Sequence, residues 1–120
     1  MRVSRLFVGW LLAGACAVDA GAAEKLRYNR DVRPILSDKC FQCHGPDGAK
    51  RQAELRLDDP KSALDHRDGK AAIIVGDAAH SRVYQRLITT HADEKMPPAE
   101  TGISLTPAEI AIVQRWINEG

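Results

Sequence analysis

Two cysteines and a histidine stand close together at residues 40–44, and their spacing suits one kind of chemistry. The order is Cys40-Phe41-Gln42-Cys43-His44. On a helical turn, residues three apart lie on one face, so both thiols can form thioethers with the two vinyl groups along one side of a porphyrin. The imidazole then lies under the ring and can bind the iron as the proximal ligand. The pattern therefore predicts covalent attachment of one haem c through Cys40 and Cys43, with His44 as an axial ligand.

Three other uses of paired cysteines fit the sequence less well. A thioredoxin-like motif needs strand and helix alternation, which the sequence does not show around residue 40. A zinc site needs a fourth ligand and usually a second close pair, whereas His66, His80 and His91 stand alone. A disulfide between Cys40 and Cys43 would close a very short loop and stabilise little. Haem attachment is therefore the favoured interpretation.

The second axial position of the iron has an outstanding candidate in Met96. It is the only methionine besides Met1, it lies in a loop after a predicted helix, and Pro97-Pro98 follow it. The prolines favour an extended backbone, so the thioether can be held toward the iron at small ordering cost. A sulfur ligand also favours ferrous iron and raises the reduction potential relative to two histidines.

Other assignments for this position stay open. Met96 could instead be a flexible apolar gap-filler, although residues 91–98 around it are mostly polar. His91 is the second candidate ligand and His80 the third. His66 lies in a charged turn and is not expected to take part.

The amino terminus has the pattern of a secretory signal peptide. Two arginines give a positive start, an apolar run spans residues 7–17, and small residues at 20–22 offer a cleavage site. The run is too short to span a bilayer comfortably. We therefore expect residues 1–23 to be removed, leaving residues 24–120 as a single small domain with no stable membrane span. Since haem is attached to c-type cytochromes outside the cytoplasm in bacteria, leader and motif agree on a periplasmic or otherwise exported protein.

Cys16 lies inside this leader. It follows residues 12–15, which loosely resemble a lipoprotein acceptor sequence but carry Ala13 where that pattern usually has leucine. We prefer the interpretation that Cys16 is discarded with the leader. The mature chain then holds only the two motif cysteines, enough for one haem and no disulfide framework.

Net charge excludes some classes of partner. The chain has 17 basic and 16 acidic side chains, and 15 of each remain without the leader. A bulk field that would gather nucleic acid or anionic lipid is therefore absent. Lys39, Lys50 and Arg51 flank the motif as a local docking patch or simply as a solvated rim. The expected partners are redox proteins, whose identity the sequence does not give.

Apolar periodicity predicts a first helix that leads straight into the motif. Asp31 is its expected N-cap, and Pro34 falls in its first turn, where no amide bond is lost. The apolar face is formed by Val32, Ile35 and Leu36. After the motif, residues 54–58 alternate in polarity and predict a short extended segment over one haem face. Residues 73–75 form an apolar block expected in the core.

Two further helices have good boundary signals. Ser81 is the expected N-cap of a helix to about Thr89. Its apolar face is formed by Val83, Tyr84, Leu87 and Ile88. The last helix opens at Thr106-Pro107-Ala108-Glu109, with an N-cap, a proline at the first position and a capping-box glutamate. Its buried stripe is formed by Ile110, Val113, Trp116 and Ile117, with the tryptophan packed against the first helix.

Taken together, these residues resemble the planctomycete-type cytochrome c domain. The matching motifs are residues 28–36, Cys40 to Pro46, residues 55–58, Gly76-Asp77, Ser81 and Met96-Pro97-Pro98. The resemblance implies an all-α, class I cytochrome c-like fold wrapped around one covalently bound haem, with Cys40 and Cys43 as attachments, His44 proximal and Met96 distal. The chain departs from the family at Val75, where proline is common. Such domains frequently stand at the amino terminus of much larger exported proteins.

These features predict an exported c-type cytochrome that carries single electrons between partners. No catalytic base or nucleophile pair is evident, so the chain is not expected to be an enzyme by itself. Two alternatives remain. The domain could be the haem-bearing module of a larger exported oxidoreductase, or a haem sensor or peroxidase-like site with an open distal face.

Overall fold

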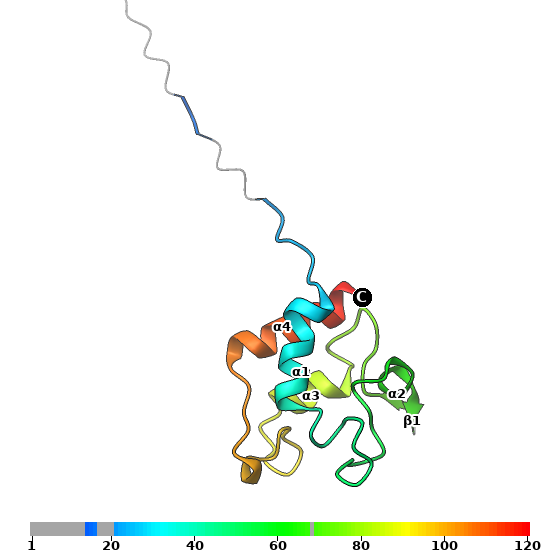
Figure 1. The fold of residues 1–120 in the computed structure, drawn as a ribbon. Coiled ribbons are helices and arrows are strands. Elements are labelled where there is room, and N and C mark those ends of the chain that lie inside the picture. The colour runs from blue at the N-terminus through cyan, green and yellow to red at the C-terminus, as the bar shows by residue number, and fades with distance from the viewer. Residues whose placement is uncertain (1–13, 17–20, 68) are drawn as a thin grey trace, which may run out of the picture.

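The computed structural model describes residues 14–16, 21–67 and 69–120. Most of the predicted leader lies outside these ranges, so its cleavage remains a prediction. The described part is a small, mostly helical domain (Figure 1). Its elements, in chain order, are a π-helical turn η1 (Tyr28–Val32), α1 (Arg33–Lys39), α2 (Pro60–Leu64), β1 (His66–Arg67), β2 (Lys70–Ala71), α3 (Arg82–Ile88), a 3-10 turn η2 (Ala99–Thr101) and α4 (Pro107–Glu119).

The first helical segment begins earlier than the sequence indicated. Asp31 is not an N-cap, because it lies inside η1, which continues directly into α1. Its carboxylate accepts hydrogen bonds from the backbone N–H of Arg27 at 2.8 Å and from Nε of Arg30 at 2.7 Å. The hydrogen bond from Arg30 lowers the pKa of Asp31 to about 2. Pro34 does lie in the first turn of α1, and the predicted apolar face of Val32, Ile35 and Leu36 is buried.

The last helix was predicted well. The hydroxyl of Thr106 accepts a hydrogen bond from the backbone N–H of Glu109 at 3.2 Å, and the Glu109 carboxylate accepts one from the Thr106 N–H at 2.7 Å. This reciprocal pair confirms the capping box that begins α4. Val113 and Ile117 are fully buried, whereas Ile110 and Trp116 are only half-buried.

The third helix has the predicted bounds but a different beginning. Ser81 precedes α3, yet its hydroxyl makes no capping bond. It is fully buried, donates to the carbonyl of Asp77 at 2.7 Å and accepts from the N–H of Ile74 at 2.8 Å. Ser81 therefore joins the preceding turn to α3. On the predicted apolar face Leu87 is buried, but Ile88 is 51% exposed, which corrects that position.

Two short elements were not expected. The sequence Asp59 caps the single-turn helix α2 by accepting a hydrogen bond from the N–H of Lys61 at 3.3 Å. After α2, β1 and β2 form an antiparallel hairpin, with His66 opposite Ala71. The described chain is therefore mostly helical rather than strictly all-α.

The predicted extended segment at residues 54–58 forms no strand. Ala53 and Glu54 have positive φ values of 53° and 51°, which break an extended run. Leu57 is buried, and its N–H donates to the carbonyl of His44 at 2.8 Å. The segment is therefore a loop folded back onto the cysteine motif.

The core lies where α4 and α3 meet the first helical segment. Figure 1 shows α4 crossing beside the beginning of that segment. The rings of Tyr28 and Trp116 meet there with centroids 5.5 Å apart. The tryptophan thus packs one turn earlier than the predicted Val32–Leu36 face. The remaining core side chains include Ile35, Leu57, Ile73, Leu87, Val113 and Ile117.

No helix among the described residues has both the length and the apolar character needed to cross a membrane.

Candidate functional site

The cysteine motif forms a tight turn at the end of α1. The N–H of Cys40 donates to the carbonyl of Leu36 at 2.8 Å, which continues the helix by one residue. The carbonyl of Cys40 then accepts from the N–H of Cys43 at 3.2 Å and of His44 at 2.9 Å. Both thiols are free and half-buried. The structure therefore brings the three predicted residues together on one helical turn, as the spacing indicated.

The Cys40 thiol does not behave as an activated nucleophile. Burial raises its pKa to about 11, and the neighbouring Cys43 adds to the effect. Redox-active cysteine pairs show the opposite, because their attacking thiol has a lowered pKa. The local environment thus disfavours a thioredoxin-like role for the pair.

The imidazole of His44 is half-buried and is held in its neutral form. Burial lowers the pKa of His44, the backbone of Gln52 opposes this, and the positive charge of Arg86 lowers it further. Nδ1 is buried and has no hydrogen-bond partner among the described residues. A neutral imidazole is the form that binds a metal. The buried Nδ1 therefore lacks the hydrogen bond that most buried polar atoms make, when only protein contacts are counted.

Gly45 follows His44 because no larger residue fits there. A Cβ atom at this position would lie 2.1 Å from the carbonyl oxygen of Phe41. Real Cβ atoms do not approach a backbone oxygen this closely, so a side chain would force the turn apart. The close approach lets the chain leave the motif immediately after the imidazole.

The loop after Gly45 is held against the motif by main-chain bonds. The N–H of Gln52 donates to the carbonyl of Cys43 at 2.7 Å, and the N–H of Leu57 donates to that of His44 at 2.8 Å. The guanidinium of Arg51 donates to the carbonyl of Gly45 at 3.1 Å and to that of Pro46 at 3.1 Å. These hydrogen bonds from Arg51 stabilise the loop.

The predicted basic patch is therefore only partly free. Besides Arg51, Lys39 is also engaged, in an ion pair with Asp38 at 3.1 Å. Lys50 is exposed.

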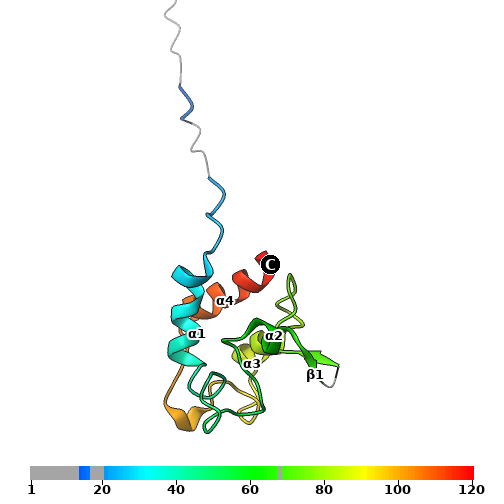
Figure 2. The same ribbon diagram turned by 45° about the vertical axis from the view of Figure 1, so that its right-hand side comes forward.

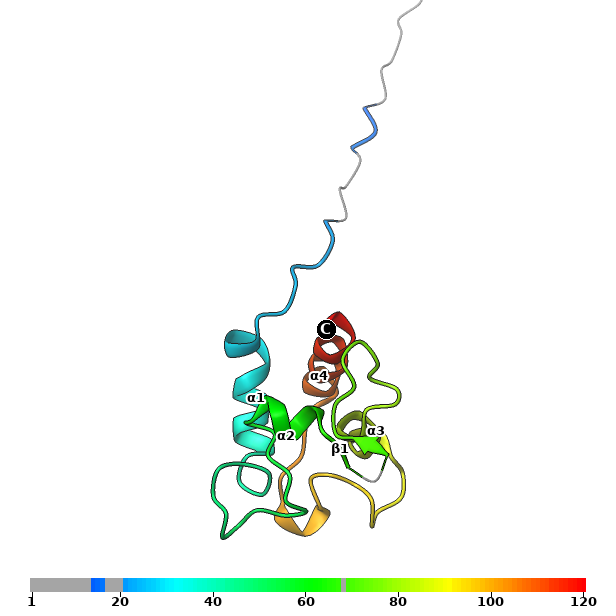
Figure 3. The same ribbon diagram turned by 90° about the vertical axis from the view of Figure 1, so that its right-hand side faces the viewer.

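Met96 lies in the loop between α3 and η2, at the same end of the domain as the cysteine motif. Figures 1, 2 and 3 show the loop after α1 and the loop after α3 together at the end opposite the carboxyl terminus. Met96 is half-buried, and its N–H donates to the carbonyl of Arg86 at 3.0 Å. This backbone bond ties the loop to α3.

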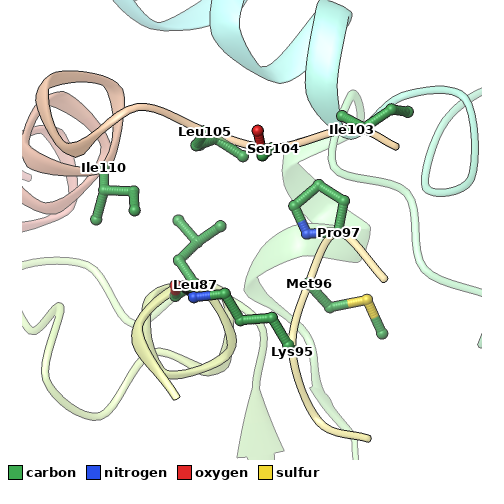
Figure 4. Close-up of a pocket in the computed structure, with 8 residues that line it drawn as sticks. All are labelled: Leu87, Lys95, Met96, Pro97, Ile103, Ser104, Leu105 and Ile110. Atoms are coloured by element: carbon green, nitrogen blue, oxygen red, sulfur yellow. Dashed lines mark hydrogen bonds between the residues drawn. The ribbon is translucent and has the colours of Figure 1, made fainter. Parts of the chain in front are cut away.

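An apolar pocket adjoins Met96, which is one of its lining residues. The pocket lies between the end of α3, the Met96 loop and the approach to α4. In Figure 4 the thioether points away from Leu87 and Ile110, which line the pocket's far side. The thioether therefore lies away from the part of the pocket that these two side chains line.

The other histidines lie on the surface. His80 and His91 are exposed, and Nδ1 of His80 is 2.8 Å from a carboxylate oxygen of Asp77. His66 is also exposed, at the start of β1. Throughout residues 14–16, 21–67 and 69–120, no three His, Cys, Asp or Glu side chains gather as a metal-binding group. The described residues thus offer no ligand set of the zinc type.

Sequence reasoning missed three residues around the site. Gly45 had a local signal in the turn-rich sequence that follows the motif, but the clash that requires it is visible only in three dimensions. Arg86 and Lys95 had no such signal, because their partners are main-chain carbonyls seven or more residues away. All three residues act on the two loops that carry the candidate ligands.

Comparison with protein families gives one match. The model of the family described as planctomycete cytochrome c matches residues 40–100, just over half of the chain. The matched range begins at Cys40 and includes His44 and Met96, while α1 and α4 lie outside it. Searches of curated proteins and of solved structures found no match. The family is typically one of electron carriers, and membership implies a covalently bound haem c, with which the Cys40–Cys43 spacing agrees. The chain belongs to the planctomycete cytochrome c family.

Proposed function

We propose that this domain is an exported electron carrier that holds one haem c, with His44 and Met96 as axial ligands. The observation that carries the proposal is the turn at the end of α1, where two free thiols and a neutral imidazole lie together within a family-matched segment. A class I cytochrome c-like wrap of the helices and loops around the cofactor is part of the proposal.

The residues present suit the cofactor. Cys40 and Cys43 would supply the sulfur atoms for two thioethers, and their half-buried thiols make no disulfide. His44 offers a neutral ring whose polar atoms the protein does not fully satisfy. When bound, haem c supplies a one-electron couple between ferric and ferrous iron. The chain's own part is to tether the group, to exclude water and to supply ligands that set the potential.

Met96 is supported as the distal ligand by its setting. Its loop lies at the same end of the domain as the motif, and its side chain points away from Leu87 and Ile110. The competing candidates His80 and His91 are exposed, and His80 is engaged with Asp77. A thioether is the kind of ligand that favours ferrous iron.

Export and redox partners belong to the same proposal. The leader pattern of residues 1–23 would direct the chain to the compartment where haem is attached. There the domain would exchange electrons with redox proteins, either as a separate carrier or as the haem-bearing part of a larger exported enzyme.

Covalent attachment is tested by replacing the cysteines. The full chain is expressed in a host that exports and matures c-type cytochromes, as wild type, as the Cys40→Ser/Cys43→Ser double variant and as Cys16→Ser. After acid-acetone extraction, the colour should stay with wild type and Cys16→Ser and leave the double variant. Extraction of haem from wild type would contradict the proposal. Membrane association that Cys16→Ser abolishes would instead revive the lipoprotein interpretation.

Ligation by Met96 is tested with carbon monoxide. Wild-type ferrous protein should resist carbon monoxide, while Met96→Ala should bind it readily and have a lower reduction potential with its haem still attached. His91→Ala is the control and should match wild type. If wild type already binds carbon monoxide and Met96→Ala differs little, Met96 is not a ligand, and a sensor or peroxidase-like site with an open distal face replaces the electron carrier.

A further inference from the structure

The carboxyl end of α3 is capped by the loop that carries Met96. A helix leaves its last four carbonyls without partners inside the helix. Here the carbonyl of Arg86 accepts the N–H of Met96 at 3.0 Å, and the carbonyl of Leu87 accepts the ammonium of Lys95. Two consecutive carbonyls of α3 are therefore satisfied by two consecutive residues of the loop.

The side chain of Arg86 holds the same loop at a second point. Its Nη1 donates to the carbonyl of Glu94 at 3.0 Å. One residue of α3 thus binds the segment Glu94–Met96 at both ends, through its carbonyl and through its guanidinium. Lys95, between these ends, reaches back to the neighbouring carbonyl of Leu87. The turn is closed on its other side, because the N–H groups of Glu94 and Lys95 both donate to the carbonyl of His91 at 3.1 Å.

We propose that Arg86 is the positioning residue for the distal ligand, holding the Glu94–Met96 segment so that the Met96 thioether is fixed relative to His44. This inference rests on the proposed function, because it assumes that Met96 binds the iron. Lys95 supports the same segment from the opposite direction.

The physical reason is the cost of ordering a loop. Fixing each residue of a loop in one backbone conformation costs conformational entropy, and a ligand held by a free loop would lose the corresponding free energy from its bond to iron. The hydrogen bonds from Arg86 and Lys95 already order the Glu94–Met96 segment, so part of this cost is met before the thioether binds. Weakening them should make Met96 easier to displace.

The test compares variants of Arg86 with a matched arginine on the same helix. Arg82 lies one turn earlier in α3 and has no hydrogen bond or ion pair among the described residues. The full-length holoprotein is prepared as wild type, Arg86→Gln, Arg86→Lys, Lys95→Met and Arg82→Gln. The affinity of the ferrous form for carbon monoxide, which must displace Met96, is then measured together with the potential.

Arg86→Gln should raise the apparent affinity for carbon monoxide about threefold to tenfold, as expected for the loss of one hydrogen bond to the loop. Lys95→Met should act in the same direction, and Arg86→Lys should recover most of the wild-type resistance. The potential should fall in Arg86→Gln, as in Met96→Ala but by less, since a less firmly held thioether favours ferrous iron less. Arg82→Gln should leave the carbon monoxide affinity unchanged.

Amide hydrogen exchange keeps the test independent of global stability. In Arg86→Gln the Met96 amide should exchange faster, while the Thr89 amide, bonded to the carbonyl of Gln85 at 3.0 Å, should keep its rate. The proposal is overturned if Arg86→Gln and Arg82→Gln behave alike while Met96→Ala still opens the site. If Met96→Ala itself has no effect, Met96 ligation has failed, and that result is distinct from a failure of Arg86.

Discussion

The helices and the two site loops are held together by different forces. Where α1, α3 and α4 meet, stability comes from side chains such as Leu36, Val113 and Ile117, which are at most 2% exposed. In residues 45–54 and 91–102 the loops are held by hydrogen bonds to main-chain carbonyls. Burial of apolar surface stabilises without regard to direction, whereas hydrogen bonds fix direction at a smaller net gain.

This difference separates folding from ligand placement. A change in the helical core should alter the free energy of unfolding and leave the axial ligands in place. A change in a site loop should cost less stability and disturb the ligands more. Four substitutions, ordered by their expected effect on stability, test this separation.

The largest loss of stability is expected for Leu36→Ala. Leu36 is 1% exposed and lies in the last turns of α1, so its truncation should cost about 2–5 kcal/mol. Urea unfolding of the holoprotein measures this. The exposed Ile88→Ala should change stability by less than about 0.5 kcal/mol. A shift in the absorption of the native Leu36→Ala protein would show that core and ligands are not separable.

Trp116→Ala should have the next largest effect. Its ring is half-buried and tilted 35° against Tyr28, so we expect a loss of about 2–3 kcal/mol, below that of a fully buried tryptophan. A double-mutant cycle with Tyr28→Leu and Trp116→Leu should give a coupling of about 0.5–1.5 kcal/mol. Strict additivity of the two changes would mean that the ring contact contributes nothing.

Gly45→Ala should cost about 1–3 kcal/mol, because its Cβ would overlap the Phe41 carbonyl and force the turn to open. Its effect on the haem spectrum should exceed that of Leu36→Ala, since His44 is the preceding residue. Gly48→Ala is the matched control, as no atom lies within 4 Å of its added Cβ. Equal spectra for the two glycine variants would refute the role assigned to the close approach at Gly45.

The smallest effect is expected at Asp31, and it should depend on pH. Because the folded pKa of Asp31 is lowered to about 2, its contribution is fully present above the ordinary value of about 3.9 and is lost as the pH falls through 2. The difference in unfolding free energy between wild type and Asp31→Asn should therefore shrink over that interval. Arg30→Gln should remove most of the same pH dependence. A difference that grows on acidification would reverse the sign we assign.

The parts that could be predicted from sequence are those with local causes. The capping box of α4 involves residues three apart, and the apolar spacing of Val32, Ile35 and Leu36 gave the buried face of α1. The turn of Cys40, Cys43 and His44 is local in the same sense, so its geometry followed from spacing.

The errors have non-local or conformational causes. The prediction of Asp31 as an N-cap is wrong, because its carboxylate accepts a hydrogen bond from the N–H of Arg27 inside the helical segment. The sequence alone does not distinguish such an aspartate from one that caps a helix. The extended segment expected at residues 54–58 forms no strand, because Leu57 bonds to His44, thirteen residues away, rather than to a neighbouring strand. Arg86 could not be found, because its role depends on a loop that folds back on its helix.

The beginning of the described domain is tied to its end. The N–H of Leu26 donates to the carboxylate of Glu119 at 2.9 Å, and the guanidinium of Arg115 donates to the carbonyl of Glu24. Figure 1 shows both ends leaving one pole of the domain, with the two site loops at the other. Domains with adjacent ends tolerate circular permutation and insertion into a host protein. This one could be spliced into a surface loop of an enzyme or repeated in tandem, with the pole that carries the two site loops left facing outward.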